Sequence, residues 1–408
     1  MIINSLPFRV KVCLFFFELF ALPFLFVWCF ISRLRNSFVT KPELPRIFMG
    51  TMHINNWVYV AKALRALGYS VDLIVWSPPF HEIDAIDYDT ILSQKWSSLF
   101  STRMGRYIFQ FFLFLWAVWR YDLFIFCFMS RLMDRSLMLK WVELPLIRFC
   151  GKKLIFNSYG ADVMTPSMTL GNRYKYSVRN GYLEDPNCRD LDEESIAKNR
   201  SYCQKWAHCV ISAIDHVQYL ERVDECFHMR CIDINGFIPN YHTQNDKPVI
   251  IHAPNHRSLK GTDCLIKAVA ELQKEDISCE LLIFEGKPHL DVIKAITQGD
   301  IVADQFLVGA YARFSIESMS LGKPVLCYLR DDLFQSNPIW AECPIINANP
   351  DNLKEKLREL ILVSSEEREQ IGLRGRSFVE KYHSMDYVGK RLSQIILKVW
   401  CASAMANA

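Results

Sequence analysis

Two cationic side chains in the second half of the sequence are spaced to bind phosphate. The apolar run 249–253 is followed by a polar segment with Arg257 and Lys260, and a helical pattern begins at 262. Arginine offers a planar fork to phosphate oxygens, lysine acts as a point charge, and a helix start presents backbone N–H groups. This order predicts a diphosphate site. A solvated loop with two ordinary cations is the open alternative.

A buried acidic side chain is predicted some 60 residues further on. The segment that starts at Asp304 contains Gly309 and enters a short helical pattern near 314–321, which carries Glu317. A carboxylate one turn inside such a helix can accept two ribose hydroxyls, while the loop amides face phosphates. The alternative is a glutamate on a solvent-facing helix surface. Apolar neighbours in the same helix and its place after a strand favour the binding role.

Candidate groups in the first half of the chain also follow predicted strands. Gly50, His53 and Asn55 come directly after the run 46–50. A glycine there allows close approach of phosphate or acceptor, and His53 could orient or protonate a group, although a lone histidine in a loop is more often solvated. Asp162 follows a later strand and either binds acceptor hydroxyls or forms a turn.

The strands and helices that position these residues are predicted to alternate in two successive α/β domains. In the first, a strand at 46–50, a helix at 57–67 and a strand at 70–76 form a βαβ opening. Further strands are predicted at 122–129, 152–157, 210–212, 249–253, 279–284, 300–303 and 324–329, and further helices at 262–274, 290–298 and 314–321. The polar stretch 166–199 is predicted to be irregular, and the apolar block 107–119 to pack in the core, with a membrane-surface helix as its alternative.

The second half resembles the donor domain of retaining GT-B glycosyltransferases, a family that includes many bacterial cell-surface polysaccharide transferases. The segments HAPNHRSLKGTDCLIKAV, ELLIFEG and DIVADQFLVGAYARFSIESMSLGKPV carry this resemblance, which continues less specifically over most of 46–400. It implies the GT-B fold, in which two Rossmann-like, doubly wound α/β domains face a cleft. It also implies transfer of a hexose from a UDP- or GDP-sugar to a glycan or lipid-linked acceptor, with retention of configuration.

The resemblance gives roles to individual residues. Arg257 and Lys260 would neutralise the departing diphosphate, and Glu317 would bind the donor ribose. Asp304, Gly309 and Tyr311 match further donor-binding positions. The loop that contains Asp162 would face the cleft. The resemblance implies no metal ion, in agreement with the lack of a metal-binding Asp-x-Asp motif in the sequence, and no cofactor beyond the nucleotide sugar as co-substrate.

Two departures from the family pattern leave other functions open. Many members have a glutamate eight residues before the ribose-binding one, where this chain has Gly309, although Asp304 and Gln305 match a subset with Asp-Gln-x-x-x-Gly. Many also have a histidine on the strand that reads Phe-Ile-Phe-Cys-Phe here, at 124–128. A catalytically inactive binding or scaffold subunit is therefore an alternative, and a nucleotide-sugar epimerase is a weaker one.

The chain length and the N-terminal run set the domain organisation. We expect an anchor at 1–45, an acceptor-side domain at 46–240, a donor-binding domain at 241–382 and a helix at 383–408 that returns to the first domain. The apolar run 12–31, broken only by Glu18 and Pro23, is long enough to cross a membrane.

Three placements of that run are considered: it spans the membrane, lies on its surface or is buried as a helix. The distribution of arginine and lysine on its two sides weakly places the body in the cytoplasm.

Composition argues against two other classes of partner. The formal net charge is only +3, and no Lys/Arg-rich run is present, so we expect no nucleic acid. The 14 cysteines are scattered singly, without Cys-x-x-Cys pairs or finger-like spacing. We therefore expect free thiols in a reducing compartment and no zinc site.

Overall fold

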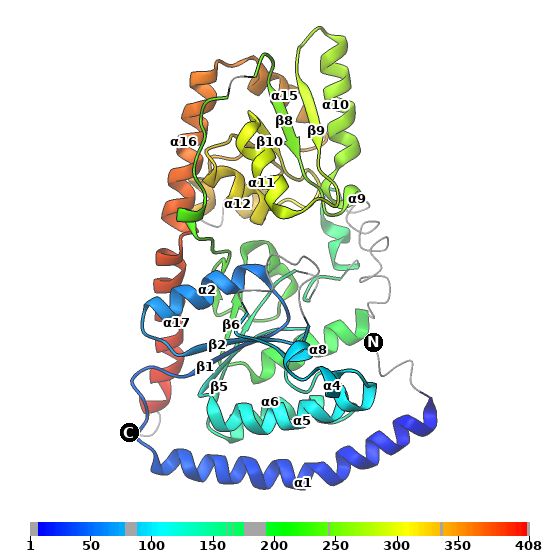
Figure 1. The fold of residues 1–408 in the computed structure, drawn as a ribbon, viewed down its shortest axis with the longest axis vertical. Helices are drawn as coiled ribbons and strands as arrows, with labels where there is room; N and C mark the ends of the chain where they lie inside the picture. The colour runs from blue at the N-terminus through cyan, green and yellow to red at the C-terminus, as the bar shows by residue number, and fades with distance from the viewer. Residues whose placement is uncertain are drawn as a thin grey trace. The chain divides into compact units, whose positions relative to one another are not determined.

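The computed structural model of this protein describes residues 7–77, 88–160, 162–165, 167–174, 193–243, 245–334 and 338–405. The chain divides into two compact units (Figure 1). Unit 1 comprises Met1–Met164, Asp192–Met229 and Gly389–Ala408, and unit 2 comprises Thr165–Leu191 and Arg230–Val388.

Unit 1 is built on a parallel seven-stranded sheet. Its strands are β1 (Ile47–Thr51), β2 (Val71–Val75), β3 (Thr90–Ile91), β4 (Leu123–Cys127), β5 (Lys153–Asn157), β6 (Cys209–Ser212) and β7 (Glu225–Cys226). Their order is β3-β2-β1-β4-β5-β6-β7. All five residues of β1 and of β4 are buried, as expected for parallel strands covered on both faces. The strands predicted in this half of the chain are confirmed.

The helices of unit 1 follow the strands. They are α1 (Phe8–Phe38), α2 (Asn55–Ala66), α3 (Leu92–Lys95), α4 (Ser97–Phe100), α5 (Arg103–Arg120), α6 (Glu143–Phe149) and α8 (Glu193–Trp206), with short 3-10 helices at Leu139–Trp141 and Ile214–Tyr219. The apolar block 107–119 lies within α5 and is mostly buried, which confirms core packing. The irregular structure predicted for 166–199 is wrong from Glu193 on, because α8 begins there. Residues 166 and 175–192 lie outside the described residues.

Unit 2 contains a parallel five-stranded sheet. Its strands are β8 (Val249–His252), β9 (Glu280–Ile283), β10 (Ile301–Ala303), β11 (Val325–Cys327) and β12 (Ile346–Asn347), in the order β12-β11-β10-β8-β9. The chain goes from β8 to β9 on one side and then to β10 on the other, so the strand order reverses at β8. In open α/β sheets, ligands bind at the carboxyl ends of the strands at such a point.

The helices of unit 2 were partly predicted. They are α9 (Arg257–Lys260), α10 (Thr262–Lys274), α11 (His289–Gln298), α12 (Arg313–Ser320), α13 (Asp331–Phe334), α14 (Pro338–Ala341), α15 (Leu353–Leu362) and α16 (Ser365–Tyr382), with 3-10 helices at Ser167–Gly171 and Ile234–Gly236. The prediction for 262–274 is confirmed at both ends. The segment before it differs from the predicted loop, because Arg257 and Lys260 form the first and last residues of the short helix α9.

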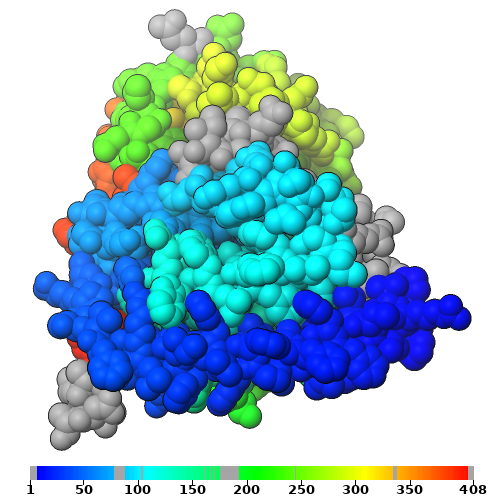
Figure 2. Space-filling model, turned by 60° about the horizontal axis from the view of Figure 1, so that its bottom comes forward, coloured from blue at the N-terminus to red at the C-terminus, as the bar shows by residue number. Residues whose placement is uncertain are grey.

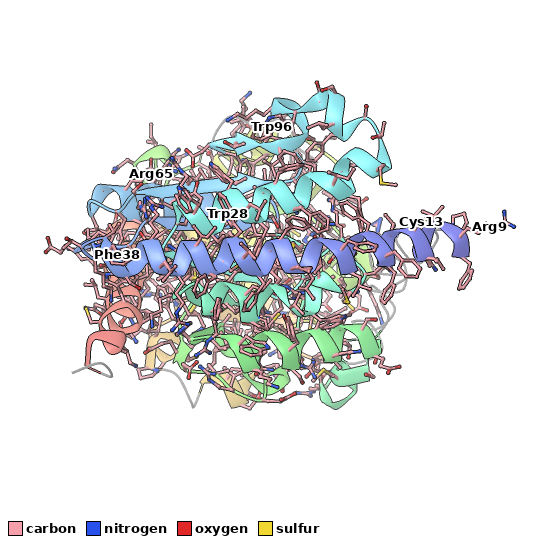
Figure 3. The ribbon with its side chains drawn as sticks, turned by 90° about the horizontal axis from the view of Figure 1, so that it is seen from below. Arg9, Cys13, Trp28, Phe38, Arg65 and Trp96 are labelled. Carbon is pink, nitrogen blue, oxygen red and sulfur yellow. The ribbon has the colours of Figure 1, made fainter. Side chains whose placement is uncertain are left out.

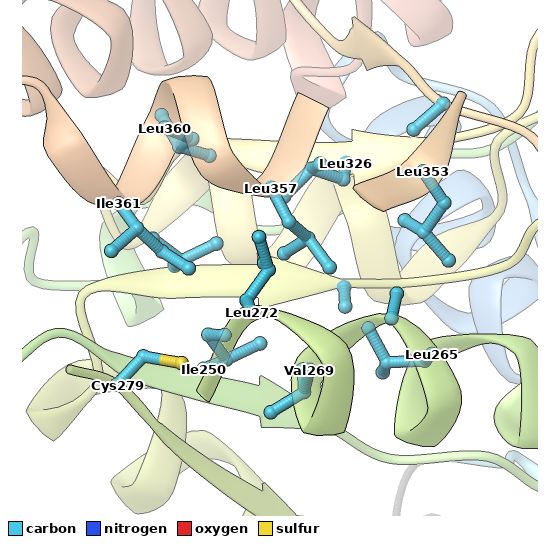
Figure 4. Packing of buried hydrophobic residues seen from close by; sticks show 14 of the residues in the cluster. Ile250, Leu265, Val269, Leu272, Cys279, Leu326, Leu353, Leu357, Leu360 and Ile361 are labelled. Atoms are coloured by element: carbon cyan, nitrogen blue, oxygen red, sulfur yellow. The ribbon is translucent and has the colours of Figure 1, made fainter. Parts of the chain in front are cut away.

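The core of unit 2 lies between the sheet and the helices α10 and α15, which pack side by side. Figure 4 shows Leu265, Val269 and Leu272 of α10 with Leu357 of α15 around Ile250 of β8. Buried apolar residues recur at intervals of three or four along α10 and along α15, so one apolar face of each helix meets the sheet. This core holds the carboxyl ends of β8 and β10 next to each other.

Two helices complete unit 1. The last helix, α17 (Met385–Met405), begins in unit 2 and belongs to unit 1 from Gly389 on. Within unit 1 it is tied by a hydrogen bond between Ser393 Oγ and Tyr69 Oη at 2.8 Å. The first helix, α1, is the one helix in the described residues that is long and apolar enough to cross a membrane. One side of it packs on α5 and α6 (Figure 3).

Candidate functional site

Three neighbouring strands of unit 2 end in charged segments. In the sheet β8 lies between β10 and β9, and the carboxyl ends of parallel strands meet at one edge. The segment after β8 carries Arg257 and Lys260, that after β9 leads to His289, and that after β10 begins with Asp304. The sequence predicted the segments after β8 and β10 at this edge and did not predict the role of the segment after β9.

Lys260 is held between two side chains from the end of β10. Its Nζ lies 2.9 Å from Asp304 Oδ1 and 2.8 Å from Gln305 Oε1. The side chain of Asp304 is 1% exposed and that of Lys260 is 12% exposed, so this is a nearly buried ion pair. Asp304 also accepts a hydrogen bond from Ser315 Oγ on α12 at 2.6 Å. Lys260 is thus a fixed cation that joins β8, β10 and α12.

Arg257 is the more available cation. Its side chain is 45% exposed, and it pairs with Asp263 Oδ1 at 3.3 Å and with Glu285 Oε2 at 3.7 Å. Exposed ion pairs at such distances contribute little to stability. The guanidinium can therefore turn toward an incoming anion at a small cost in free energy. A side chain that binds phosphate reversibly requires this freedom.

Glu317 is buried, so the solvent-facing alternative for this residue is wrong. Its side chain is 4% exposed and accepts hydrogen bonds from His289 Nε2 at 3.0 and 3.1 Å and from Arg313 Nε at 2.6 Å. Burial alone would raise the pKa of Glu317, but the hydrogen bond from His289 and the charge of Arg313 hold it below its ordinary value. The site therefore presents an ionised carboxylate at neutral pH.

Gly309 is required by its surroundings. Its φ is +86°, and a Cβ atom added there would lie 2.3 Å from Cγ of Arg330. Arg330 also donates its backbone N–H to the Gly309 carbonyl at 3.0 Å. A side chain at position 309 would therefore require Arg330 to move and a positive φ that favours glycine.

Tyr311 lies in the interior of unit 2. Its side chain is fully buried, its hydroxyl is 3.0 Å from His383 Nε2, and its ring packs against Trp340 at 5.3 Å between centroids. A side chain engaged in this way packs the core and holds α16 and the following turn. The side chain of Tyr311 thus has a structural role, and a donor contact at this position stays a prediction.

The candidates in unit 1 at and after the end of β1 lie at the point where that sheet reverses its strand order. β1 lies between β2 and β4, and Thr51 Oγ1 is 3.0 Å from the carbonyl of Arg131, which follows β4. A Cβ at Gly50 would lie 1.9 Å from the Ile74 carbonyl of β2, so only glycine fits. His53 is half-buried, and burial lowers its pKa. Asn55 is the first residue of α2.

Asp162 joins two strand ends of unit 1. Its Oδ1 accepts the backbone N–H groups of Tyr159 and Gly160 at 2.9 and 2.8 Å, and its Oδ2 accepts that of Phe128 at 3.2 Å. The residue is 3% exposed, and burial raises its pKa. These bonds give the carboxylate a structural role in the turn, which was the alternative to the predicted contact with acceptor hydroxyls.

Sequence reasoning missed the two donors that hold Glu317. Arg313 precedes Glu317 by four residues, a spacing that predicts a pair on one helix face and could have been recognised. His289 opens α11 after the β9 segment, and nothing in its local sequence indicates its partner. In the part of the chain that the structure describes, no three His, Cys, Asp or Glu side chains are grouped to hold a metal ion.

Comparisons with known proteins bear on the fold. No family model matches the chain, and no curated protein matches it. Among solved structures, sucrose-phosphate synthase from Thermosynechococcus elongatus is similar at 13% identity and a TM-score of 0.58, over 88% of this chain and 100% of that chain. A glycosyltransferase from Rickettsia africae ESF-5 is similar at 14% identity and a TM-score of 0.56, over 88% and 99%.

A third similar structure is that of Anabaena HepE in complex with UDP and glucose, at 12% identity and a TM-score of 0.53, over 86% of this chain and 99% of that chain. At such identities the likeness is one of fold. With its two parallel-sheet, Rossmann-like units, this chain has the GT-B fold, as the sequence predicted.

Proposed function

We propose that this protein is a glycosyltransferase that moves a hexose from a UDP- or GDP-sugar to a glycan or lipid-linked acceptor, with retention and without a metal ion. The observation that carries the proposal is the set of charges at the reversal point of the unit 2 sheet. An exposed Arg257 and a nearly buried Lys260 lie on α9, after β8, and the ionised Glu317 lies on α12, after β10. The similar HepE structure contains UDP and glucose, which supports this assignment.

The reaction breaks the bond between the anomeric carbon and the diphosphate oxygen. An acceptor oxygen bonds to that carbon and gives up its proton, and negative charge grows on the departing diphosphate. In our proposal Arg257 turns from its exposed partners to that diphosphate, and Lys260 adds a fixed positive charge. Fixed cations that meet charge as it develops lower the barrier more than they tighten substrate binding.

Glu317 would bind the ribose hydroxyls of the donor. A carboxylate offers about four acceptor positions, and the bonds from His289 and Arg313 leave room for a hydroxyl. These two donors also keep the carboxylate ionised and oriented. We include His289 in the proposed donor site for this reason, together with Asp304 and the Gly309 backbone.

The acceptor side rests on unit 1. We propose His53 as the group that takes the acceptor proton, because it follows β1 at the reversal point of the unit 1 sheet and its half-buried imidazole can accept a proton when neutral. Gly50 and Asn55, which lie on the same segment as His53, are the proposed acceptor contacts. Asp162 would act only by holding its loop.

Release of nucleotide from donor sugars by the full chain in detergent tests the proposal. We expect UDP or GDP to appear with one matching donor, and Arg257→Ala to lower the rate by about a hundredfold, the usual effect of removing one charge-stabilising donor. Lys294→Ala is the matched control, because Lys294 is a 73% exposed cation with only a surface partner. Equal rates in both variants would contradict the role of Arg257.

The inactive-subunit alternative is supported by one observation. Arg330 fills the place where a glutamate side chain would stand, so the missing group cannot be supplied at position 309. The alternative predicts that the protein binds UDP or GDP. It also predicts that no nucleotide is released from any UDP- or GDP-sugar, whichever acceptor glycan is added.

A further inference from the structure

The N-terminal helix α1 is bound to unit 1 along one side only. Its buried residues are Leu14, Glu18, Leu25, Cys29 and Ser32, which recur every three, four or seven residues and so form one stripe. The helix has 31 residues and is about 46 Å long at 1.5 Å per residue. Figure 3 shows it crossing the face of unit 1 from Arg9 to Phe38, with Trp28 near α5.

Glu18, the one acidic residue of α1, is turned into unit 1. Its carboxylate accepts the backbone N–H groups of Leu137, Met138 and Leu139 at 2.7, 2.6 and 2.9 Å, and the hydroxyl of Tyr107. Three consecutive N–H groups at the start of a 3-10 helix form a strong anion site. The charge in the middle of the apolar run is therefore satisfied by the protein.

Side chains in the second half of α1 donate hydrogen bonds to carbonyls in and after α5 and α6. Trp28 Nε1 donates to the Leu115 carbonyl at 3.0 Å, and Arg35 Nη1 donates to the Trp119 carbonyl at 2.9 Å. Asn36 Nδ2 donates to the Cys150 carbonyl at 3.1 Å. Trp119 and Cys150 lie at the ends of α5 and α6, where carbonyls have no partner within the helix, so Arg35 and Asn36 satisfy groups that unit 1 leaves open.

The other side of α1 is apolar and exposed. Phe20 and Phe24 are 70% and 76% exposed, and large apolar side chains continue along this side to Ile31. Figure 2 shows α1 in dark blue as a continuous band beside the cyan surface of α5. On α5, Phe112 and Trp116 add exposed apolar area next to the residues that contact α1. A surface of this extent marks an interaction site.

The exposed charges that α1, α5 and α6 themselves carry are basic. The acidic residues of α1, α5 and α6 are Glu18 and Glu143, and both are fully buried. Arg9, Arg33 and Arg148 are exposed at the ends of α1 and α6. An apolar surface with basic residues at its margins is complementary to a bilayer that contains anionic lipid.

We propose that α1 lies in the plane of a membrane and docks unit 1 on one leaflet, rather than crossing the bilayer. A crossing helix would have to withdraw Glu18 from its four donors or carry α5 and the 137–139 segment into hydrocarbon. In-plane docking keeps every one of these bonds and buries the exposed phenylalanines among the acyl chains. The apolar side is thus the lipid-binding surface of the protein.

Flotation of the full chain with phosphatidylcholine vesicles, with and without phosphatidylglycerol, tests the surface. We expect binding that phosphatidylglycerol strengthens, and a loss of about tenfold or more in Phe20→Glu/Phe24→Glu. Leu362→Glu is the control, since Leu362 is 66% exposed on unit 2. Flotation of the double variant equal to the wild type would overturn the proposal. A lipid-free dimer that only this variant disperses would overturn it too, in favour of a second copy on this surface.

Sidedness in sealed membrane vesicles separates in-plane docking from spanning. Cleavable tags at both ends of the chain should be cut from the same face of the membrane if α1 lies in the plane. Cleavage of the two tags from opposite faces would show a spanning helix and overturn the proposal. Neither experiment uses a nucleotide, so its failure leaves the proposed transferase untouched, and the failure of nucleotide release leaves the docking proposal untouched.

Discussion

Replacing Lys260 by methionine tests whether the cation at the reversal point is structural as well as functional. The change keeps most of the side-chain volume but removes the partner of Asp304, whose side chain is 1% exposed. Among the residues that the structure describes, Ser315 Oγ would be the side-chain donor that remains to that carboxylate. Removing one member of a buried ion pair costs about 3–5 kcal/mol, because the remaining charge is left without compensation.

The expected loss is measurable by thermal unfolding of the full chain in detergent. At about 2–4 °C per kcal/mol for a unit of this size, we expect Lys260→Met to lower the unfolding temperature of unit 2 by about 6–20 °C. Faster amide hydrogen exchange in unit 2 than in unit 1 would assign the loss of stability to unit 2. Lys294→Met, at an exposed surface position, is the control. Lys260→Met/Asp304→Asn should be more stable than Lys260→Met, because both charges are then gone.

Two results would refute this reasoning. The first is an unfolding temperature for Lys260→Met that equals that of Lys294→Met, which would mean that Asp304 is solvated in solution. The second is a double variant that is no more stable than Lys260→Met, which would mean that the uncompensated charge is not the cause.

Three further predictions concern other parts of the chain. Glu18→Ala leaves three backbone N–H groups without an acceptor at about 1–3 kcal/mol each, so we expect unit 1 to lose about 3 kcal/mol or more and the 137–139 amides to exchange faster. Unchanged exchange there would contradict the contact. Gly50→Ala places a Cβ 1.9 Å from a carbonyl oxygen and should cost unit 1 more than about 1 kcal/mol in thermal unfolding, whereas Gly236→Ala meets nothing within 4 Å and should be neutral. Burial lowers the pKa of His383 from 6.5 to about 4. As the pH falls, this imidazole is therefore protonated in the unfolded chain before it is protonated in the folded chain. Stability of unit 2 should therefore drop by up to about 3 kcal/mol between pH 6.5 and about 4, and His383→Gln should flatten that slope in denaturant titrations. An equal slope in both would contradict it.

The sheet elements could be predicted because their signals are local. Runs such as 249–253 and 300–303 are apolar and bounded by proline, glycine or charge, and the structure places β8 and β10 within one residue of these bounds. The helix at 262–274 has apolar residues at a clear helical spacing, and α10 matches it. Patterns of this kind need no knowledge of tertiary contacts.

The contacts that define the site could not be predicted in this way. Lys260 and Asp304 are 44 residues apart, and they meet only because β8 and β10 are neighbours in a particular register. The placement of α1 could not be predicted from local patterns either, because its composition alone is compatible with crossing a membrane. Its placement depends on Glu18, whose partners lie about 90–120 residues away.

The side chains of two candidates have partners within the fold. Asp162 follows a predicted strand and Tyr311 matches a position of the resembling family, and both are hydrogen-bonded inside their own units. Polar groups in a fold must find partners, and most of those partners belong to the fold itself. Separating the two cases requires knowledge of burial, which periodicity gives for helix faces and not for irregular loops.

Calorimetric titration of the full chain in detergent with UDP and with GDP tests the central claim most directly. The account predicts that one of these diphosphates binds the wild type and binds Arg257→Ala about tenfold more weakly or worse, while Lys294→Ala binds like the wild type. Absence of binding by either diphosphate, or equal affinity in Arg257→Ala, would contradict a donor site at the carboxyl ends of β8 and β10.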